Sequence, residues 1–424
     1  MGRHLSGGRS TRKSGIVLCM ALALTVLLSV AVQAAQREIV AVLYGSEIQA
    51  RLAWAIEEFQ AQNPDIKVEV MMVQGGTTDE LKENILVRMA GGVKMDVIPL
   101  FMGYFDEFVA LDVVQPLDAF IARDRQDFDD IIPGVAALFE SEGSHYALPS
   151  EYAGKAVVYN KSYFQQIGLA DPNMDWTWTD LAEMARVARR VNSEGEIEMG
   201  GFGHHFADRY WHHDPLAIIL WAFGADYFNE DTTELMLHTP QAREALQFIV
   251  DNWQDRGVFT PQSGFFAGRL AMSNVGSWEL TQVNETPFDV GIVPYPHGPA
   301  GAYNFPGYWG YAISSDAGDL EASWRFLQFL SNDYVMQQVR ERSGMPVRKS
   351  HLASSEWLDG LFPWESTEVW NYSLQTARSF NYGFYGNDVI NMIGPEWIKA
   401  LNGEIGVDFL IDSVKPVADE MLQR

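Results

Sequence analysis

Three apolar runs near the beginning of the chain alternate with two amphipathic segments, and this alternation restricts the fold more than any other feature of the sequence. The runs cover residues 39–43, 66–73 and 95–101, and the segments between them place apolar residues at helical spacing. Asn63-Pro64-Asp65 is expected to end the first helix. Because a strand–helix–strand–helix–strand order needs crossover connections, it predicts an α/β fold with a mainly parallel sheet flanked by helices.

A second α/β unit begins near the middle of the chain. With 424 residues, the chain exceeds what one hydrophobic core usually serves, so two lobes are expected. The chain is predicted to cross between them first at 149–152, where Pro149 can hold one side of a hinge, and to return after the strand 288–296. The predicted lobes are 35–149 with 296–343, and 150–295 with 344–424.

The N-terminus has the three parts of a secretory signal peptide. Four Lys and Arg residues precede the apolar run 16–32, and small residues follow at Ala34 and Ala35. We expect residues 1–34 to be removed, although a run of this length is only slightly shorter than a membrane anchor needs. Cys19, the only cysteine, lies in this segment, so the mature chain has no disulfide or thiol chemistry.

The predicted mature chain is strongly acidic. Without the four signal-peptide cations, 26 Lys and Arg stand against 56 Asp and Glu, a formal charge of −30. Such a charge repels nucleic acid and anionic lipid and keeps a protein soluble, so no nucleic-acid partner is expected.

The stretch 265–278 combines a predicted buried strand with a candidate ligand contact. The apolar run 270–275 ends on Gly276, Ser277 and Trp278. In α/β sheets ligands bind beyond the carboxyl ends of the strands, so the Trp278 indole could lie against a sugar ring. The alternative is that Trp278 fills the hydrophobic core.

Several segments, in this order, resemble a known family. They are Tyr146-Ala147-Leu148-Pro149 with Val158-Tyr159-Asn160-Lys161, Trp176-Thr177-Trp178, the stretch 266–278, Val290-Gly291-Ile292-Val293-Pro294-Tyr295-Pro296, Gly307-Tyr308-Trp309, and Gly344-Met345-Pro346-Val347-Arg348. Together they resemble the extracellular solute-binding proteins of ABC importers, family 1, which contains the maltose- and oligosaccharide-binding proteins.

The resemblance implies a periplasmic, monomeric protein with the type II two-lobed periplasmic-binding-protein fold. It implies a ligand cleft at the hinge between the lobes, a carbohydrate ligand released unaltered to the transmembrane subunits of an ABC permease, and no cofactor. A polyol or glycerol phosphate is an alternative ligand, and a secreted polysaccharide-degrading enzyme is an alternative of another class.

The candidate ligand contacts lie on loops that follow or precede strands. The expected aromatic contacts are Trp278, Trp309, Tyr308 and Trp211. Gly276 and Ser277, which precede Trp278, are also expected to contact the ligand. The expected polar contacts are Ser46, Glu47, Tyr104, Glu151, His212, Asp214 and Arg348. Helix capping, solvation or pairing with a carboxylate are the alternative roles of the polar residues.

The histidine-rich segment 204–214 could suggest a metal, but its adjacent histidine pairs lack helical ligand spacing, and no metal is expected there. No nucleophile elbow or phosphate loop is present, so no catalytic residue is assigned. An enzyme would need two carboxyl groups converging in the cleft, for which Glu47, Glu151, Asp214 and Glu279 are the candidates.

Overall fold

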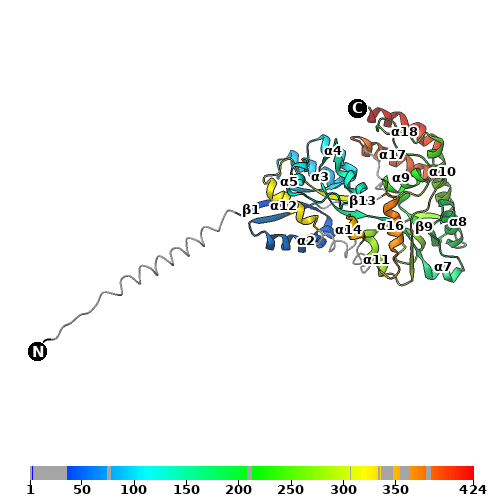
Figure 1. Cartoon of the computed structure of the whole chain (residues 1–424). Helices are drawn as coiled ribbons and strands as arrows, with labels where there is room; N and C mark the ends of the chain where they lie inside the picture. Colours follow the sequence, from blue (N-terminus) through cyan, green and yellow to red (C-terminus); the bar gives the residue numbers. More distant parts are fainter. Residues whose placement is uncertain are drawn as a thin grey trace.

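Two β-sheets, each covered by helices, form two lobes that lie next to each other (Figure 1). This computed structural model describes Gly2 and residues 36–73, 78–207, 213–305, 307–332, 335, 347–353, 362–378 and 383–424. Apart from Gly2, the expected signal peptide 1–34 lies outside the described residues. Among the helices described, none is both long and apolar enough to cross a bilayer.

The first lobe is built on a five-stranded sheet of order β2-β1-β3-β13-β6. Its strands are β1 (Arg37–Tyr44), β2 (Ile66–Val73), β3 (Val97–Phe101), β6 (Leu148–Ala153) and β13 (Gly307–Ile313). β1 runs parallel to β2 and β3, and β13 runs antiparallel to β3 and β6. The sheet is therefore mixed, because β13 lies between β3 and β6 and runs antiparallel to both.

Helices cover this sheet and connect its strands (Figure 1). They are α2 (Gly45–Gln62), α3 (Thr78–Ala90), α4 (Phe105–Ala110), α5 (Asp118–Asp124), α6 (Pro133–Ala136), α12 (Leu320–Leu330) and α14 (Lys349–Leu352), with the 3-10 turns η1 (Met102–Tyr104) and η2 (Ala137–Phe139) and the small hairpin β4 (Glu140–Ser141) and β5 (Ser144–His145).

The predicted strand–helix–strand–helix–strand unit is present at the start of the lobe. α2 ends at the expected Asn63, whose side-chain amide donates to the Phe59 carbonyl over 2.9 Å. β3 begins two residues later than predicted, at Val97, because Asp96 is buried in another role. Its carboxylate accepts the backbone N–H groups of Val40 and Gly318 over 2.7 and 2.6 Å.

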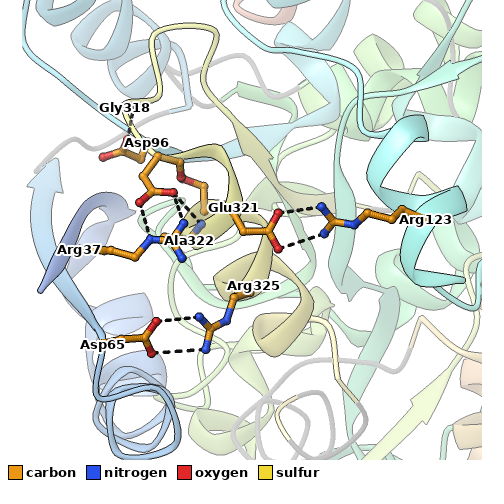
Figure 2. A network of polar contacts seen from close by, with 10 residues as sticks. Arg37, Asp65, Asp96, Arg123, Gly318, Glu321, Ala322 and Arg325 are labelled. Atoms are coloured by element: carbon orange, nitrogen blue, oxygen red, sulfur yellow. Dashed lines mark hydrogen bonds and ion pairs between the residues drawn. The ribbon is translucent and has the colours of Figure 1, made fainter. Parts of the chain in front are cut away.

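Charged side chains fasten the outer part of this lobe around the start of α12 (Figure 2). Three arginines pair there, Arg37 with Asp319, Arg123 with Glu321 and Arg325 with Asp65, at nitrogen–oxygen distances of 2.5, 2.7 and 2.9 Å. Asp319 also caps α12 by accepting the Ala322 N–H over 3.1 Å. These contacts join α12 to segments more than 190 residues earlier in the chain.

The second lobe repeats the pattern of the first. Its main sheet has the order β10-β9-β11-β7-β12, formed by β7 (Lys155–Asn160), β9 (Ile197–His204), β10 (Phe259–Pro261), β11 (Leu270–Gly276) and β12 (Val290–Val293), and β8 (Arg190–Val191) pairs with β9. β9 is parallel to β10 and β11, and β7 is antiparallel to β11 and β12.

The helices of the second lobe lie around this sheet (Figure 1). They are α7 (Lys161–Ile167), α8 (Trp178–Ala188), α9 (His213–Ala222), α10 (Pro240–Gln254), α11 (Leu280–Asn284), α16 (Thr367–Gln375), α17 (Gly386–Leu401) and α18 (Val407–Leu422), with the 3-10 turns η3 (His205–Ala207) and η4 (Ser277–Glu279). α8 starts with a capping box formed by Thr177 and Asp180.

β9, an inner strand of the second sheet, is glycine-rich, and its sequence therefore does not suggest a strand. Residues 197–204 form β9, although three of these eight residues are glycines. At Gly201 a Cβ would lie 2.4 Å from the Ala185 carbonyl oxygen of α8. Glycine is therefore required by the close approach of helix and strand, although it weakens the strand signal.

The chain passes between the lobes at segments that meet at one buried residue. The first passage follows Ala153 of β6, because β6 pairs with β13 as far as Ala153. Asn304, in the return passage, donates its side-chain amide to the Lys155 carbonyl over 2.7 Å. Its backbone N–H donates to the Thr376 carbonyl over 2.9 Å, in the segment after α16.

Two other segments bear on the lobe boundaries. Residues 347–353, expected in the second lobe, contact the first: Lys349 N–H donates to the Asp130 carbonyl over 2.8 Å. From the second lobe, the start of α17 reaches back, since the Asn387 amide donates to the Gly103 carbonyl of η1 and the Asn391 amide to the Asp79 carboxylate over 3.1 Å.

Candidate functional site

Aromatic rings gather at the same end of three neighbouring strands of the first sheet. Tyr44 and Phe101 are the last residues of the parallel strands β1 and β3, and Trp309 pairs with Phe101 near the beginning of antiparallel β13. The Trp309 ring is stacked on Tyr44, with centroids 5.7 Å apart and planes at 22°, and its centroid lies 5.0 Å from that of Phe101. All three residues are half-buried, so this cluster, the first-lobe platform, presents ring surface.

In the second lobe, Trp278 follows the end of β11 in the turn η4. Its indole lies over Gly276, where a Cβ would come within 2.3 Å of the ring atoms, so only glycine leaves room for it. Trp278 is 37% exposed, whereas Ser277 is fully buried. Trp278 therefore does not fill the core, and its ring is available at the surface.

A buried lysine lies beneath this tryptophan. The Lys155 ammonium nitrogen is 5.8 Å from the ring centroids of both Trp278 and Phe305. Only 7% of Lys155 is exposed, and its burial lowers its pKa to about 7, against the opposing effect of the Glu279 carboxylate. Lys155 therefore packs between the Trp278 and Phe305 rings, and cation–π attraction adds to this packing only while its amine is protonated.

Glu279 closes the same turn. Its carboxylate accepts the Gly276 N–H over 2.9 Å, and the Gln262 amide lies 3.4 Å from its other oxygen. Burial raises the pKa of Glu279, although the Gly276 hydrogen bond opposes that shift. The two candidate tryptophans thus flank the first passage, because Trp309 pairs with Glu151 of β6 and Trp278 lies over Lys155 of β7.

Two predicted polar contacts are buried in the first lobe. The Tyr104 ring lies 4.7 Å from that of Phe108, and its hydroxyl donates to the Pro99 carbonyl over 3.2 Å. Arg348 donates to the Ser331 carbonyl over 3.0 Å, and a guanidinium nitrogen lies 3.6 Å from the Asp130 carboxylate. Both side chains join elements of the lobe, which is the pairing role considered for Arg348, so their contact with a ligand stays a prediction.

Seven predicted contacts are placed only by their backbone or lie outside the described residues. Ser46 and Glu47 are in the first turn of α2, Asp214 is in α9, and Glu151 and Tyr308 are in the paired strands β6 and β13. Trp211 and His212 lie outside the described part of the chain.

The histidine-rich segment contributes to the core rather than to a metal site in its described part. His204 is fully buried, its ring is stacked on Phe206 at 3.9 Å, and its Nε2 lies 3.3 Å from the Tyr295 hydroxyl. Burial holds its pKa well below the usual value, so the ring is neutral. No group of three His, Cys, Asp or Glu side chains among the described residues could hold a metal ion.

The sequence indicated Trp309 but not its ring partners, Tyr44 and Phe101. Each ends an apolar run and stands one or two residues before a glycine, a position that marks the carboxyl end of a strand. That signal was available for both. Their contact with Trp309 depends on the register of β13, which enters the sheet some 200 residues later.

The sequence also matches known proteins. The family of bacterial extracellular solute-binding proteins matches over residues 44–336. A maltotriose-binding protein of Pyrococcus abyssi is 24% identical over 314 residues, 71% of this chain and 64% of that protein.

Two solved structures share the fold. An ABC substrate-binding protein of Listeria monocytogenes in complex with cycloalternan has a TM-score of 0.80 and 22% identity, over 91% of this chain and 98% of the other. UgpB of Mycobacterium tuberculosis in complex with glycerophosphocholine has a TM-score of 0.79 and 22% identity, over 90% and 98%. The predicted two-lobed α/β fold is thereby confirmed.

Proposed function

The chain belongs to the family of bacterial extracellular solute-binding proteins, and on that premise we propose that it binds a neutral carbohydrate in the cleft between its lobes. It then passes the carbohydrate unaltered to the transmembrane subunits of an ABC permease. As a member of an extracellular family it is a secreted or periplasmic protein. Residues 1–34 act as the cleaved signal peptide of this proposal, and the mature chain works as a monomer.

The observation that carries the proposal is the pair of ring surfaces on the two sides of the first passage. The first-lobe platform presents Trp309, and the second lobe presents the exposed indole of Trp278. Flat rings pack against the C–H faces of sugars, and a ligand between two such rings buries both of its faces. The maltotriose-binding relative and the cycloalternan-bound structure support this ligand class.

Binding is tested first on the mature chain with a panel of saccharides that includes glucose, maltose and maltotriose. A bound saccharide raises the melting temperature by mass action, because it binds the folded chain and not the unfolded one. Calorimetric titration then gives the dissociation constant, and Trp278→Ala is expected to raise it at least tenfold. If no saccharide in the panel shifts the melting temperature, the proposed ligand class is wrong.

A glycerophosphodiester is the second candidate ligand. The glycerophosphocholine-bound structure favours it, and Lys155 can attract a phosphate at pH values below its pKa of about 7, where its amine is protonated. Against it stands the acidic chain as a whole, whose field repels anions. Glycerophosphocholine in the same thermal screen separates the two candidates.

Release of the ligand unaltered separates binding from catalysis. Incubation of the chain with the bound saccharide, followed by chromatography, should return the same saccharide after hours. Accumulation of shorter saccharides would instead support a polysaccharide-degrading enzyme.

A further inference from the structure

A pocket of about 290 Å³ opens in the second lobe beside the turn that carries Trp278. The ends of β10 and β11 form its sides, Val158 of β7 contributes to its wall, and the loop 262–266 covers it. Glu279 is one of its lining residues, whereas Trp278 is not. The pocket is therefore adjacent to the candidate tryptophan and distinct from it.

The pocket contains a buried acceptor that lacks a partner. Asn274 of β11 lines it and is only 5% exposed. Within the described part of the chain, nothing donates a hydrogen bond to the Asn274 side-chain oxygen. Because buried polar atoms are nearly always hydrogen-bonded, this oxygen has acceptor capacity that a group bound in the pocket can use.

Glu279 supplies further acceptor capacity next to Asn274. One of its oxygens accepts the Gly276 N–H, and each carboxylate oxygen has more than one lone-pair site. The Gln262 amide donates to the Asn274 backbone carbonyl over 2.8 Å, which holds this polar side of the pocket in place. Two acceptors on a fixed wall suit the hydroxyl groups of a ligand, which can donate to both.

The remaining wall is apolar and aromatic. Phe265 and Phe266 line it, with ring centroids 6.1 Å apart at an angle of 82°. Phe266 is half-buried and offers accessible ring surface, whereas Val158 and Val275 also line the pocket but are fully buried. The volume of the pocket is close to the lower limit of the ~300–1,000 Å³ typical of ligand pockets. It therefore suits one sugar ring and not a chain of sugar rings.

We propose that this pocket binds one hydroxyl-bearing unit of the carbohydrate, with Asn274 and Glu279 accepting its hydroxyl hydrogens and Phe266 contacting its C–H face. The rest of the ligand then extends past Trp278 into the interlobe cleft. This inference rests on the proposed function and adds to it a specificity site in the second lobe.

Replacement of Asn274 is the direct test, using the saccharide that binds best in the panel described above. Asn274→Leu removes the acceptor and places an apolar group in the pocket, so the dissociation constant should rise at least tenfold. Asn274→Asp keeps an oxygen at the same position and should stay within about threefold of the wild type. Equal affinity of Asn274→Leu and the wild type would overturn the proposal while leaving the proposed function intact.

A second pair of variants avoids the buried strand, in case Asn274→Leu fails to fold. Phe266→Trp enlarges a half-buried side chain that lines the pocket and should weaken binding of the same saccharide at least fivefold. Phe288→Trp is the matched control, because Phe288 is also half-buried and packs on Phe265 at 5.6 Å but does not line the pocket. Equal affinity of these two variants would contradict the pocket assignment. Failure of every saccharide to bind the wild type would overturn both this inference and the proposed function.

Discussion

The edges of the two lobes that carry the candidate tryptophans are built in different ways. In the first lobe, Trp309 is stacked on Tyr44 and packed on Phe101, so each ring is supported by other rings. In the second lobe, Trp278 lies over the backbone of Gly276 with the buried Lys155 behind it and Glu279 in the same turn. The ring of Trp309 is thus packed among other rings of its lobe, whereas the ring of Trp278 lies on the surface of its lobe.

This difference separates two tasks that one tryptophan cannot perform equally well. A ring embedded in other rings offers a fixed flat surface and discriminates little between ligands of similar shape. A ring next to ionisable groups and a polar pocket lies where hydrogen bonds can select a ligand. We therefore expect the first lobe to contribute mainly contact area and the second lobe to set specificity.

The largest expected effect tests whether the two tryptophans differ in their support. Trp309→Ala should lower the free energy of unfolding by about 2–3 kcal/mol, because it removes a half-buried side chain and two ring contacts. Trp278→Ala should lower it by about 1 kcal/mol or less, because its ring is partly exposed and lies over a glycine. Urea unfolding followed by circular dichroism measures both, and equal losses would remove the contrast between the lobes.

The effect next in size, taken per pH unit, concerns the buried lysine of the second lobe. Burial lowers the pKa of Lys155 from 10.5 to about 7, so above pH 7 the unfolded chain holds a proton there that the folded chain has released. Stability from this residue should rise with pH between about 7 and 10, by roughly 1 kcal/mol per pH unit.

Lys155→Met should abolish that slope, because methionine has no titrating group and a similar apolar stem. Thermal unfolding at several pH values between 7 and 10 measures it for the two proteins in parallel. Glu279, whose pKa is raised from its ordinary value of 4.5, changes the stability on the acidic side of this profile. A wild-type profile as flat as that of the variant would show that Lys155 keeps its proton in the folded chain.

The smallest expected effect lies far from the platform, in the ion pairs around α12 (Figure 2). Arg325→Ala removes a pair with Asp65 whose side chains are 33% and 47% exposed, so the free energy of unfolding should fall by about 0.5 kcal/mol. That loss should shrink further at 1 M salt, because salt screens exposed charges. A loss as large as that of Trp309→Ala would mean that charges, and not rings, hold the first lobe together.

The sequence predicts most of the first lobe because its strands and helices follow regular patterns. The unit from β1 to β3 agrees with the predicted order, and Asn63 ends α2 as expected. β9 was missed because close contact with α8 selects glycine at Gly201, which is also the residue that marks turns. A glycine that tertiary packing requires thus looks, in the sequence, like a glycine that marks a turn.

The candidate site could be predicted only as single positions. Trp278 and Trp309 stand at strand ends, which the sequence marks, but the stacking of Trp309 on Tyr44 depends on pairing between distant strands. The role of Lys155 could not be predicted, because nothing in the sequence around it reveals its burial. Asn274, inside an apolar run, carries no signal that it lines a pocket.

Asn304 joins stretches of chain that are far apart in sequence. Through one buried residue, the start of β7, the return passage and the segment after α16 are held together. A lobe that rotates about this point must carry all three stretches with it. Any relative rotation of the lobes that separated these stretches would have to break the hydrogen bonds of Asn304, a residue outside the predicted ligand contacts.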